Sequence, residues 1–217
     1  MKDAYLAADR KGSRLAALIW VRRDYFARVE PAGPAVARLE ELVVDDPDGA
    51  AHLLRGWIRG QGYGYPQDWA ASAADLETSA AAGNADALFE LSVLAATGRG
   101  MPQDDARSRD HLDRAAAVGH PRALYNVAAE HATGRGRPQD SARALELYVR
   151  AAEQGHARAA WTAGVMTLTG EGTRPDADRA GHLLLEARDL GFDLEGATAA
   201  LPDALRQRVV AALDGRG

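Results

Sequence analysis

Residues 121–156, with the sequence PRALYNVAAEHATGRGRPQDSARALELYVRAAEQGH, decide the fold because they contain one complete structural unit. The segment 122–133 has no internal glycine or proline, and it predicts a helix, here called helix A. The pair Gly134 and Gly136 ends this helix, because glycine accepts the positive φ of a helix C-cap without penalty.

A second helix, helix B, follows the glycine pair. The segment 138–140, Pro-Gln-Asp, introduces it, and Asp140 suits the N-cap because its carboxylate accepts backbone N–H bonds at the positive end of the helix. We expect helix B to extend from Ser141 to about Gln154 and to end at Gly155. One unit is therefore a pair of helices joined by a glycine-rich turn.

Helix B also has the spacing of an amphipathic helix. Glu146 and Arg150 are four residues apart, and we expect them to form an exposed ion pair. Four small or aromatic residues fall on one face of the helix: Ala144, Tyr148, Ala151 and Ala152.

The unit occurs four times without an insertion, at a period of 36 residues. A fixed period of this size is typical of a stacked solenoid. Small residues recur on helix A, where they let a neighbouring helix approach closely. The recurring turn and cap residues are Gly83, Gly119, Gly155 and Gly191, the pairs Gly62/Gly64, Gly98/Gly100, Gly134/Gly136 and Gly170/Gly172, and Asp68, Asp104, Asp140 and Asp176. The recurring small residues are Ala51, Ala87, Ala123 and Ala159, and Gly56, Ser92, Ala128 and Gly164.

The pattern resembles the Sel-one-like repeat (SLR) family, which is related to the tetratricopeptide repeats. The resemblance rests on A-x-A-x-x-x-x-small, on G-x-G followed by P-Q-D, and on the ending A-A-x-x-G-H, and it covers about residues 49–192. It implies an all-α, right-handed α-solenoid of four helix-turn-helix repeats with helical caps. The fourth copy departs from P-Q-D at 174–176, and the valine usual after G-x-G is replaced by Tyr65, Met101, Arg137 and Thr173.

The two ends of the chain lie outside the period and are interpreted as caps, because the terminal repeats of a solenoid otherwise expose an apolar flank. Helical stretches are expected near 13–29 and 34–44, and an amphipathic one at 202–213. The acidic segment 45–48 is interpreted as a solvated linker that also caps the next helix. The chain is thus predicted to consist of an N-terminal helical cap, four repeats and a C-terminal capping helix: residues 1–48, 49–192 and 193–217.

Composition limits the classes of function. The net charge of −5 argues against nucleic acid, since phosphate binding needs clustered Lys and Arg. There is no cysteine, so disulfides and thiolate zinc sites are excluded. The longest apolar run, Leu15–Val21, is too short to span a bilayer and is not followed by a cleavage site. We expect a soluble, cytoplasmic protein; the sequence leaves the oligomeric state open and is compatible with a monomer.

Few residues point to catalysis or metal binding. His120 and His156 share a repeat position, which favours a role in the turn over a catalytic one, and the other histidines lack ligand spacing. The glycine pairs follow helices rather than strands, and no G-K-[ST] follows them, so they are interpreted as turns rather than phosphate loops. The acidic segment lacks the spaced ligands of an EF-hand loop. We therefore expect no metal, no cofactor and no enzymatic activity.

One face of helix A is the candidate binding surface. Resemblance to tetratricopeptide arrays implies that this face lines a concave groove. Its apolar residues and its basic edge fit a helix or an extended peptide with acidic residues. The alternative is that the aromatic residues pack between helices. The predicted surface consists of Leu53, Trp57, Phe89, Val93, Arg122, Tyr125, Arg158, Trp161 and Val165.

The function that follows is non-catalytic protein–protein binding by a scaffold or adaptor on the concave face. A second hypothesis is a bacterial immunity protein that binds and neutralises a cognate toxin or secreted effector. A third, an enzyme or a small-molecule regulator, requires a pocket with converging titratable groups, and the sequence offers no such set.

Overall fold

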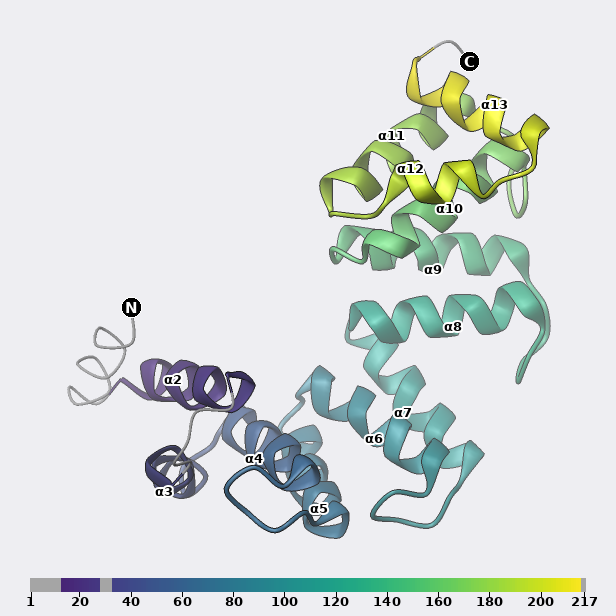
Figure 1. Cartoon of the computed structure of the whole chain (residues 1–217). Helices are drawn as coiled ribbons and strands as arrows, with labels where there is room; N and C mark the ends of the chain where they lie inside the picture. Colours follow the sequence, from purple (N-terminus) through teal and green to yellow (C-terminus); the bar gives the residue numbers. More distant parts are fainter. Residues whose placement is uncertain (1–12, 28–32, 216–217) are drawn as a thin grey trace. The chain divides into compact units, whose positions relative to one another are not determined.

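The computed structural model describes residues 13–27 and 33–215. Within these residues every regular element is a helix (Figure 1), which confirms the all-α class. Before the repeats lie α2 (Arg14–Phe26) and α3 (Gly33–Leu42). The repeats and the C-terminal part contain α4 (Ala50–Gln61), α5 (Trp69–Ala81), α6 (Ala85–Thr97), α7 (Asp105–Ala117), α8 (Pro121–Thr133), α9 (Ser141–Glu153), α10 (Ala157–Thr169), α11 (Ala177–Asp189), α12 (Leu194–Ala199) and α13 (Asp203–Leu213).

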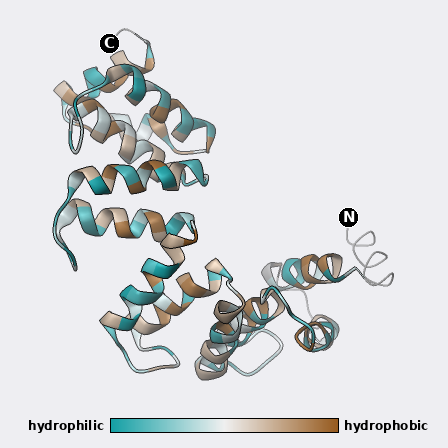
Figure 2. Cartoon of the chain, turned by 180° about the vertical axis from the view of Figure 1, so that it is seen from behind, coloured by the Kyte–Doolittle hydropathy of each residue, from teal (hydrophilic) through white to brown (hydrophobic). Residues whose placement is uncertain are grey.

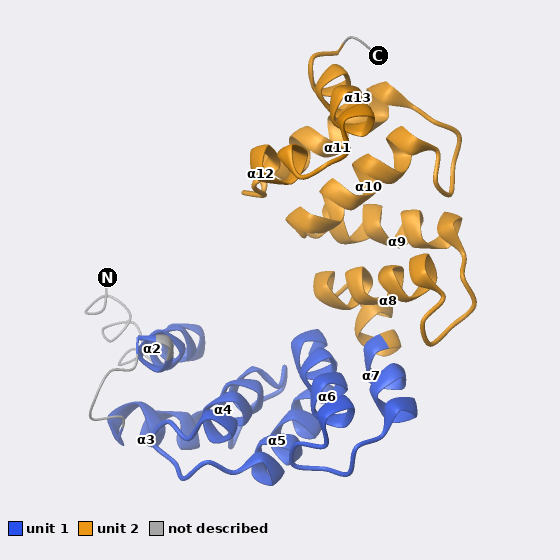
Figure 3. Cartoon of the chain, turned by 45° about the vertical axis from the view of Figure 1, so that its right-hand side comes forward, with its two compact units in different colours: residues 1–112 blue, residues 113–217 orange. Residues whose placement is uncertain are grey.

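The chain forms two compact units, residues 1–112 and residues 113–217, with the boundary inside α7 (Figure 3). Each unit has its own buried residues. The division by contacts therefore differs from the predicted division by repeat pattern at 48/49 and 192/193, and those two boundaries stay predictions.

Helices A and B of a repeat pack as pairs, as the period predicts: α4 with α5, α8 with α9, and α10 with α11. The paired helices carry both hydrophobic and hydrophilic residues (Figure 2). Each of them has buried residues, as expected of amphipathic helices. The small-residue position lies at the closest approach. A Cβ atom on Gly164 would lie 2.9 Å from Leu184 of α11, and one on Gly56 would lie 3.0 Å from Leu76 of α5.

The aspartate that recurs in each repeat caps helix B, as predicted. Asp68, Asp140 and Asp176 each accept a hydrogen bond of 2.9 Å from the backbone N–H three residues later. Asp104 accepts a bond of 3.0 Å from Arg107 in the same way. These bonds satisfy N–H groups that have no partner inside the helix.

Helix A is capped by the residue that follows the inter-repeat glycine. The imidazole Nδ1 of His120 accepts from the N–H of Ala123 at 3.1 Å, and that of His156 accepts from Ala159 at 3.2 Å. Asn84 does the same for α6 with its amide oxygen. The repeated histidines thus have a structural task, which is what their recurrence favours.

The second glycine of a turn lies against the helix B of the preceding repeat. A Cβ atom on Gly172 would lie 2.2 Å from the backbone oxygen of Ser141, and one on Gly100 would lie 2.0 Å from that of Trp69. Both glycines also have positive φ. No other residue type fits without moving the backbone, so this contact sets the spacing of consecutive repeats.

Two expectations for the helices need correction. The predicted ion pair between Glu146 and Arg150 does not form; Arg143, one turn earlier on the same side of α9, binds Glu146 at 2.6 Å instead. The C-terminal part holds a short helix, α12, before the expected final helix α13. Its six residues are too few to give a helical period in the sequence.

Candidate partner-binding surface

The predicted surface residues differ in how far solvent reaches them. Leu53 and Phe89 are only 7% and 3% exposed, so they pack inside the first unit, as the packing alternative expects of them. Val93 is 38% exposed. The others are partly or fully exposed: Trp57, Tyr125, Trp161 and Val165 are half-buried, and Arg122 and Arg158 are exposed. Five of the predicted residues lie in the unit 113–217: Arg122, Tyr125, Arg158, Trp161 and Val165.

In that unit the aromatic residues of helix A stack on rings from the rest of the repeat. The ring of Tyr125 stacks on His156, with centroids 4.6 Å apart, and makes a tilted contact with Tyr148, with centroids 5.3 Å apart. The ring of Trp161 stacks on Phe192 at 5.5 Å. Phe192 occupies the same repeat position as His156, so the two stacks are equivalent along the sequence. The stacks fix the rings while leaving part of each ring exposed.

Burial changes the titration of the groups around Tyr125. It raises the pKa of Tyr148 to about 12, so that phenol stays protonated. Burial, with the charges of Arg122 and Arg158, lowers the pKa of His156. A neutral imidazole is required there, because its Nδ1 must accept the cap hydrogen bond of α10.

The first unit has a different aromatic arrangement. Trp57 and Val93 border a hollow of about 160 Å³, to which Tyr25 and Trp69 also contribute. Arg99 lies over the ring of Trp69, with the guanidinium carbon 5.2 Å from the centroid. Trp69 was not predicted from the sequence, because it is the first residue of α5, a helix B, and the predicted surface contains only residues of helix A.

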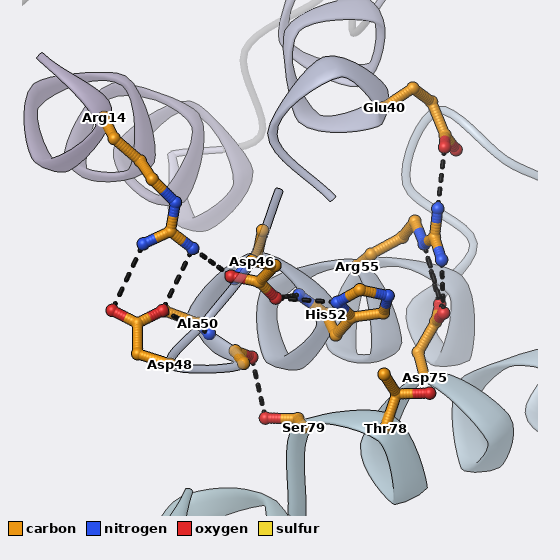
Figure 4. A network of polar contacts seen from close by, with 12 residues as sticks. Arg14, Glu40, Asp46, Asp48, Ala50, His52, Arg55, Asp75, Thr78 and Ser79 are labelled. Atoms are coloured by element: carbon orange, nitrogen blue, oxygen red, sulfur yellow. Dashed lines mark hydrogen bonds and ion pairs between the residues drawn. The ribbon is translucent and has the colours of Figure 1, made fainter. Parts of the chain in front are cut away.

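An ionic network around the buried Asp75, also missed, joins α3, α4 and α5 in the first unit (Figure 4). Asp75 is only 4% exposed and accepts hydrogen bonds from Arg55 at 2.6 Å and from Arg59 at 3.0 Å. Arg55 also donates a hydrogen bond to Glu40 of α3 at 2.7 Å, and the hydroxyl group of Tyr65 donates a hydrogen bond to the same carboxylate. Burial opposes the ionisation of Glu40, but the hydrogen bonds from Tyr65 and Arg55 outweigh it and hold its pKa below the ordinary value.

One residue of the acidic linker is less solvated than the sequence predicts, whereas Asp45, Pro47 and Asp48 are exposed. The side chain of Asp46 is 1% exposed and binds both Arg14 and the ring of His52 (Figure 4). Its oxygens also accept from the N–H groups of Ala51 at 3.0 Å and His52 at 2.8 Å. Asp46 thus caps α4, as predicted for this segment, and ties it to α2.

The described part of the chain gives no sign of an ion site or a membrane span. In residues 13–27 and 33–215, no group of three or more His, Cys, Asp or Glu side chains lies close enough to hold a metal ion. No helix in these ranges has the length and apolar content that a bilayer crossing needs.

Comparison with known families matches the repeats directly. The family model described as the Sel1 repeat matches residues 85–120, 121–156 and 157–192, in register with the 36-residue period. The chain belongs to the Sel1 repeat family. Residues 49–84, the first predicted copy, lie outside the matched ranges, although α4 and α5 pair in the same way as the later helices.

Solved structures support the Sel1 repeat fold. The chain is similar to a Sel1 repeat protein from Oxalobacter formigenes, with 26% identity and a TM-score of 0.78 over 89% of this chain and 56% of that protein. A protective antigen of uropathogenic Escherichia coli with an SLR fold shares 17% identity and a TM-score of 0.69, over 99% of this chain and 49% of the antigen. A putative Sel1 repeat protein from Klebsiella pneumoniae shares 18% identity and a TM-score of 0.54, over 98% of this chain and 99% of that protein.

The chain spans about half the length of the first two of these proteins. No curated protein is similar enough in sequence to count as a relative. Sel1 repeat proteins are generally protein-interaction scaffolds without catalytic activity.

Proposed function

We propose that this Sel1 repeat chain is a non-catalytic interaction module that binds a partner protein or peptide on the exposed face of its A helices. The surface in the unit 113–217 consists of Tyr125, Trp161 and Val165, with Arg122 and Arg158 at its basic edge. In the first unit, Trp57 and Val93 occupy the repeat position of Val165. Leu53 and Phe89, which occupy the position of Tyr125 and Trp161, are buried and are left out of the proposal.

The observation that carries the proposal is the pair of ring stacks. Tyr125 and Trp161 are each held against a neighbouring ring and remain partly exposed. An aromatic side chain that is already fixed loses little conformational entropy when a partner covers it. Tyrosine and tryptophan also carry a hydrogen-bonding group at the edge of the ring, which is why they are frequent in binding hot spots.

The charge of the surface favours an acidic partner. Arg122 and Arg158 lie one helical turn before Tyr125 and Trp161, and both are exposed. Exposed charges at the rim of an interface act mainly on the rate of association, so a partner with acidic residues would be attracted at low salt. A scaffold or adaptor that binds an acidic peptide or a protein surface fits these features.

The test is capture of the partner from the native host, followed by binding measurements with variants of the full chain. Tyr125→Ala and Trp161→Ala should each weaken binding by roughly 2 kcal/mol or more, as hot-spot aromatics do. Stability should fall by less than the roughly 3–5 kcal/mol expected for a fully buried aromatic. Val118→Ala is the matched control, since Val118 is an exposed apolar residue of the same unit, 59% exposed.

Two outcomes would contradict the surface. Unchanged affinity in both aromatic variants, with normal folding, would place the binding site elsewhere. Severe unfolding with unchanged affinity of the folded fraction would assign the rings to packing alone. Capture of a toxin or secreted effector, neutralised on binding, would favour the immunity hypothesis over the adaptor.

A further inference from the structure

The unit 113–217 contains a second feature that the aromatic surface does not use: a basic hollow of about 230 Å³. It is formed by the end of α7, by α8, by the turn after α8 and by α9. Its polar lining is His131, Arg137, Arg143, Arg150 and Asp113. Three arginines and a histidine around a space this small are unusual for a turn that only connects two helices.

Two of the arginines already have carboxylate partners. Arg137 donates to Glu130 at 2.7 Å and to Asp113 at 3.0 Å, and its side chain is 17% exposed. Arg143 binds Glu146 at 2.6 Å on the exposed side of α9. These pairs hold the walls of the hollow and leave little net charge from the two residues.

The side chains of the remaining two basic residues have no protein partner in the described ranges. The guanidinium of Arg150 makes no hydrogen bond or ion pair with any residue in the described ranges, and the residue is partly exposed. The Nδ1 atom of His131 is buried and likewise has no hydrogen-bond partner among the described residues. A buried polar atom without a partner is energetically unfavourable, and a guanidinium offers five N–H donors. These two groups therefore lack an acceptor with negative charge.

The repeat itself does not require these groups. One repeat later, the residues in the positions of His131, Arg137 and Arg150 are Thr167, Thr173 and Glu186. Helices α10 and α11 form the same pair as α8 and α9 without any of the three basic side chains. Since the fold is kept without them, the basic groups of the third repeat are not explained by folding.

We infer that the hollow binds the carboxylate of an acidic side chain from a bound peptide, with Arg150 and His131 as the donors. Arginine binds a carboxylate with two parallel hydrogen bonds, which suits a small site that is open on one side. Phosphate offers similar oxygens, so it is the alternative source of the same chemistry. That the acidic group belongs to a peptide rests on the proposed function, but the hollow and the aromatic surface share no residue.

The experiment uses the full chain, a short blocked poly-glutamate peptide and, separately, inorganic phosphate at low ionic strength. NMR signals of the His131 ring and the Arg150 guanidinium report binding in the hollow. Arg150→Gln should weaken peptide binding about tenfold or more, because it removes one partner of a charge-assisted pair. Arg150→Lys keeps the charge and should retain part of the affinity. Arg174→Gln, at an exposed arginine of the same unit outside the hollow, is the matched control and should change affinity less than about twofold.

His131→Thr introduces the residue that the next repeat carries, so it should fold and still weaken peptide binding several-fold. Melting of each variant separates loss of binding from loss of fold. Peptide binding that depends on Arg150, with or without phosphate binding, supports the inference. Binding of phosphate alone overturns the acidic peptide as occupant, and signals that move only near Arg122 and Arg158 overturn the hollow as a site. Tyr125→Ala should leave the His131 signals responsive, so this site and the proposed aromatic surface can fail independently.

Discussion

The first and third repeats have the same helix pair but hold it together by different chemistry. In the first, the partly buried Arg55 of α4 and the buried Asp75 of α5 form an ion pair. In the third, the same two positions hold Val127 and Leu147, both buried. The 36-residue period thus fixes the backbone geometry through its glycines, small residues and caps. The side chains that pack between the two helices of a pair can be either ionic or apolar.

The largest expected effect is a loss of stability in the first repeat, where the helix pair is held by ionic contacts. Asp75→Ala should lower the free energy of unfolding of the first unit by roughly 3–5 kcal/mol, because it leaves Arg55 and Arg59 partly buried without their main partner. Denaturant unfolding measures the change.

The double variant Arg55→Val with Asp75→Leu tests the comparison itself, since it installs the residues of the third repeat. Its stability should return most of the way to that of the parent, because a buried ion pair can often be replaced by apolar residues at little loss. A double variant as unstable as Asp75→Ala would mean that the two repeats are not equivalent in packing.

The second prediction concerns what the repeats share. Gly100→Ala and Gly172→Ala should each lower stability by roughly 1–3 kcal/mol, because the new methyl group meets a backbone oxygen of the preceding helix B. Gly155→Ala should lose only about 1 kcal/mol, since its φ is positive but no atom lies within 4 Å of the new methyl group. Chemical denaturation of the three variants makes the comparison, and equal losses would contradict the close contact.

The third prediction concerns the caps of helix B, which both repeats have. Asp68→Ala and Asp140→Ala should each lower stability by roughly 0.5–2 kcal/mol, the usual range for an N-cap. Asp140→Asn is the matched control and should keep most of the stability, because its amide oxygen still accepts the N–H of Arg143. If both alanine variants melt like the parent but lose partner binding, the recurring aspartates take part in binding rather than in capping.

The smallest effect is a pH dependence in the unit 113–217. The pKa of His156 is lowered in the folded chain by burial and by neighbouring arginines, so the unfolded chain takes up the proton more readily. Stability from this residue is therefore complete above the unfolded pKa of roughly 6.5 and is lost as the pH falls below it, down to the folded pKa. Melting temperatures between pH 8 and pH 5 should fall less in His156→Asn, which keeps a capping oxygen. Identical pH profiles would show that His156 does not titrate in this way.

The sequence predicted the fold well because the fold depends on local and repeating features. Gly134 and Asp140 predict a helix end and a helix start by backbone conformation alone, and both are found as expected. The period predicts which small residues lie between helices, and Gly56 and Gly164 lie there.

The candidate sites were harder to predict, because long side chains choose partners by geometry that the period does not contain. Arg150 is correctly spaced to bind Glu146, yet it lines the basic hollow while Arg143 takes the glutamate. The burial of Asp75 was also missed, because an isolated aspartate in a helix is usually on the surface. The signal was its position, which is leucine in the third and fourth repeats.

The ionic contacts of the first repeat have a consequence for the order of the repeats along the chain. Arg55 of α4 and Tyr65 of the following turn both bind Glu40, a residue of α3 that precedes the repeats. The third repeat does not require a carboxylate from a preceding cap helix, since its equivalent positions hold Val127 and Arg137. Arg137 binds two carboxylates of its own unit. Residues 49–84 are thus chemically matched to the helix before them. A shuffled array that placed this segment anywhere but first would leave an arginine and a phenol without their shared acceptor.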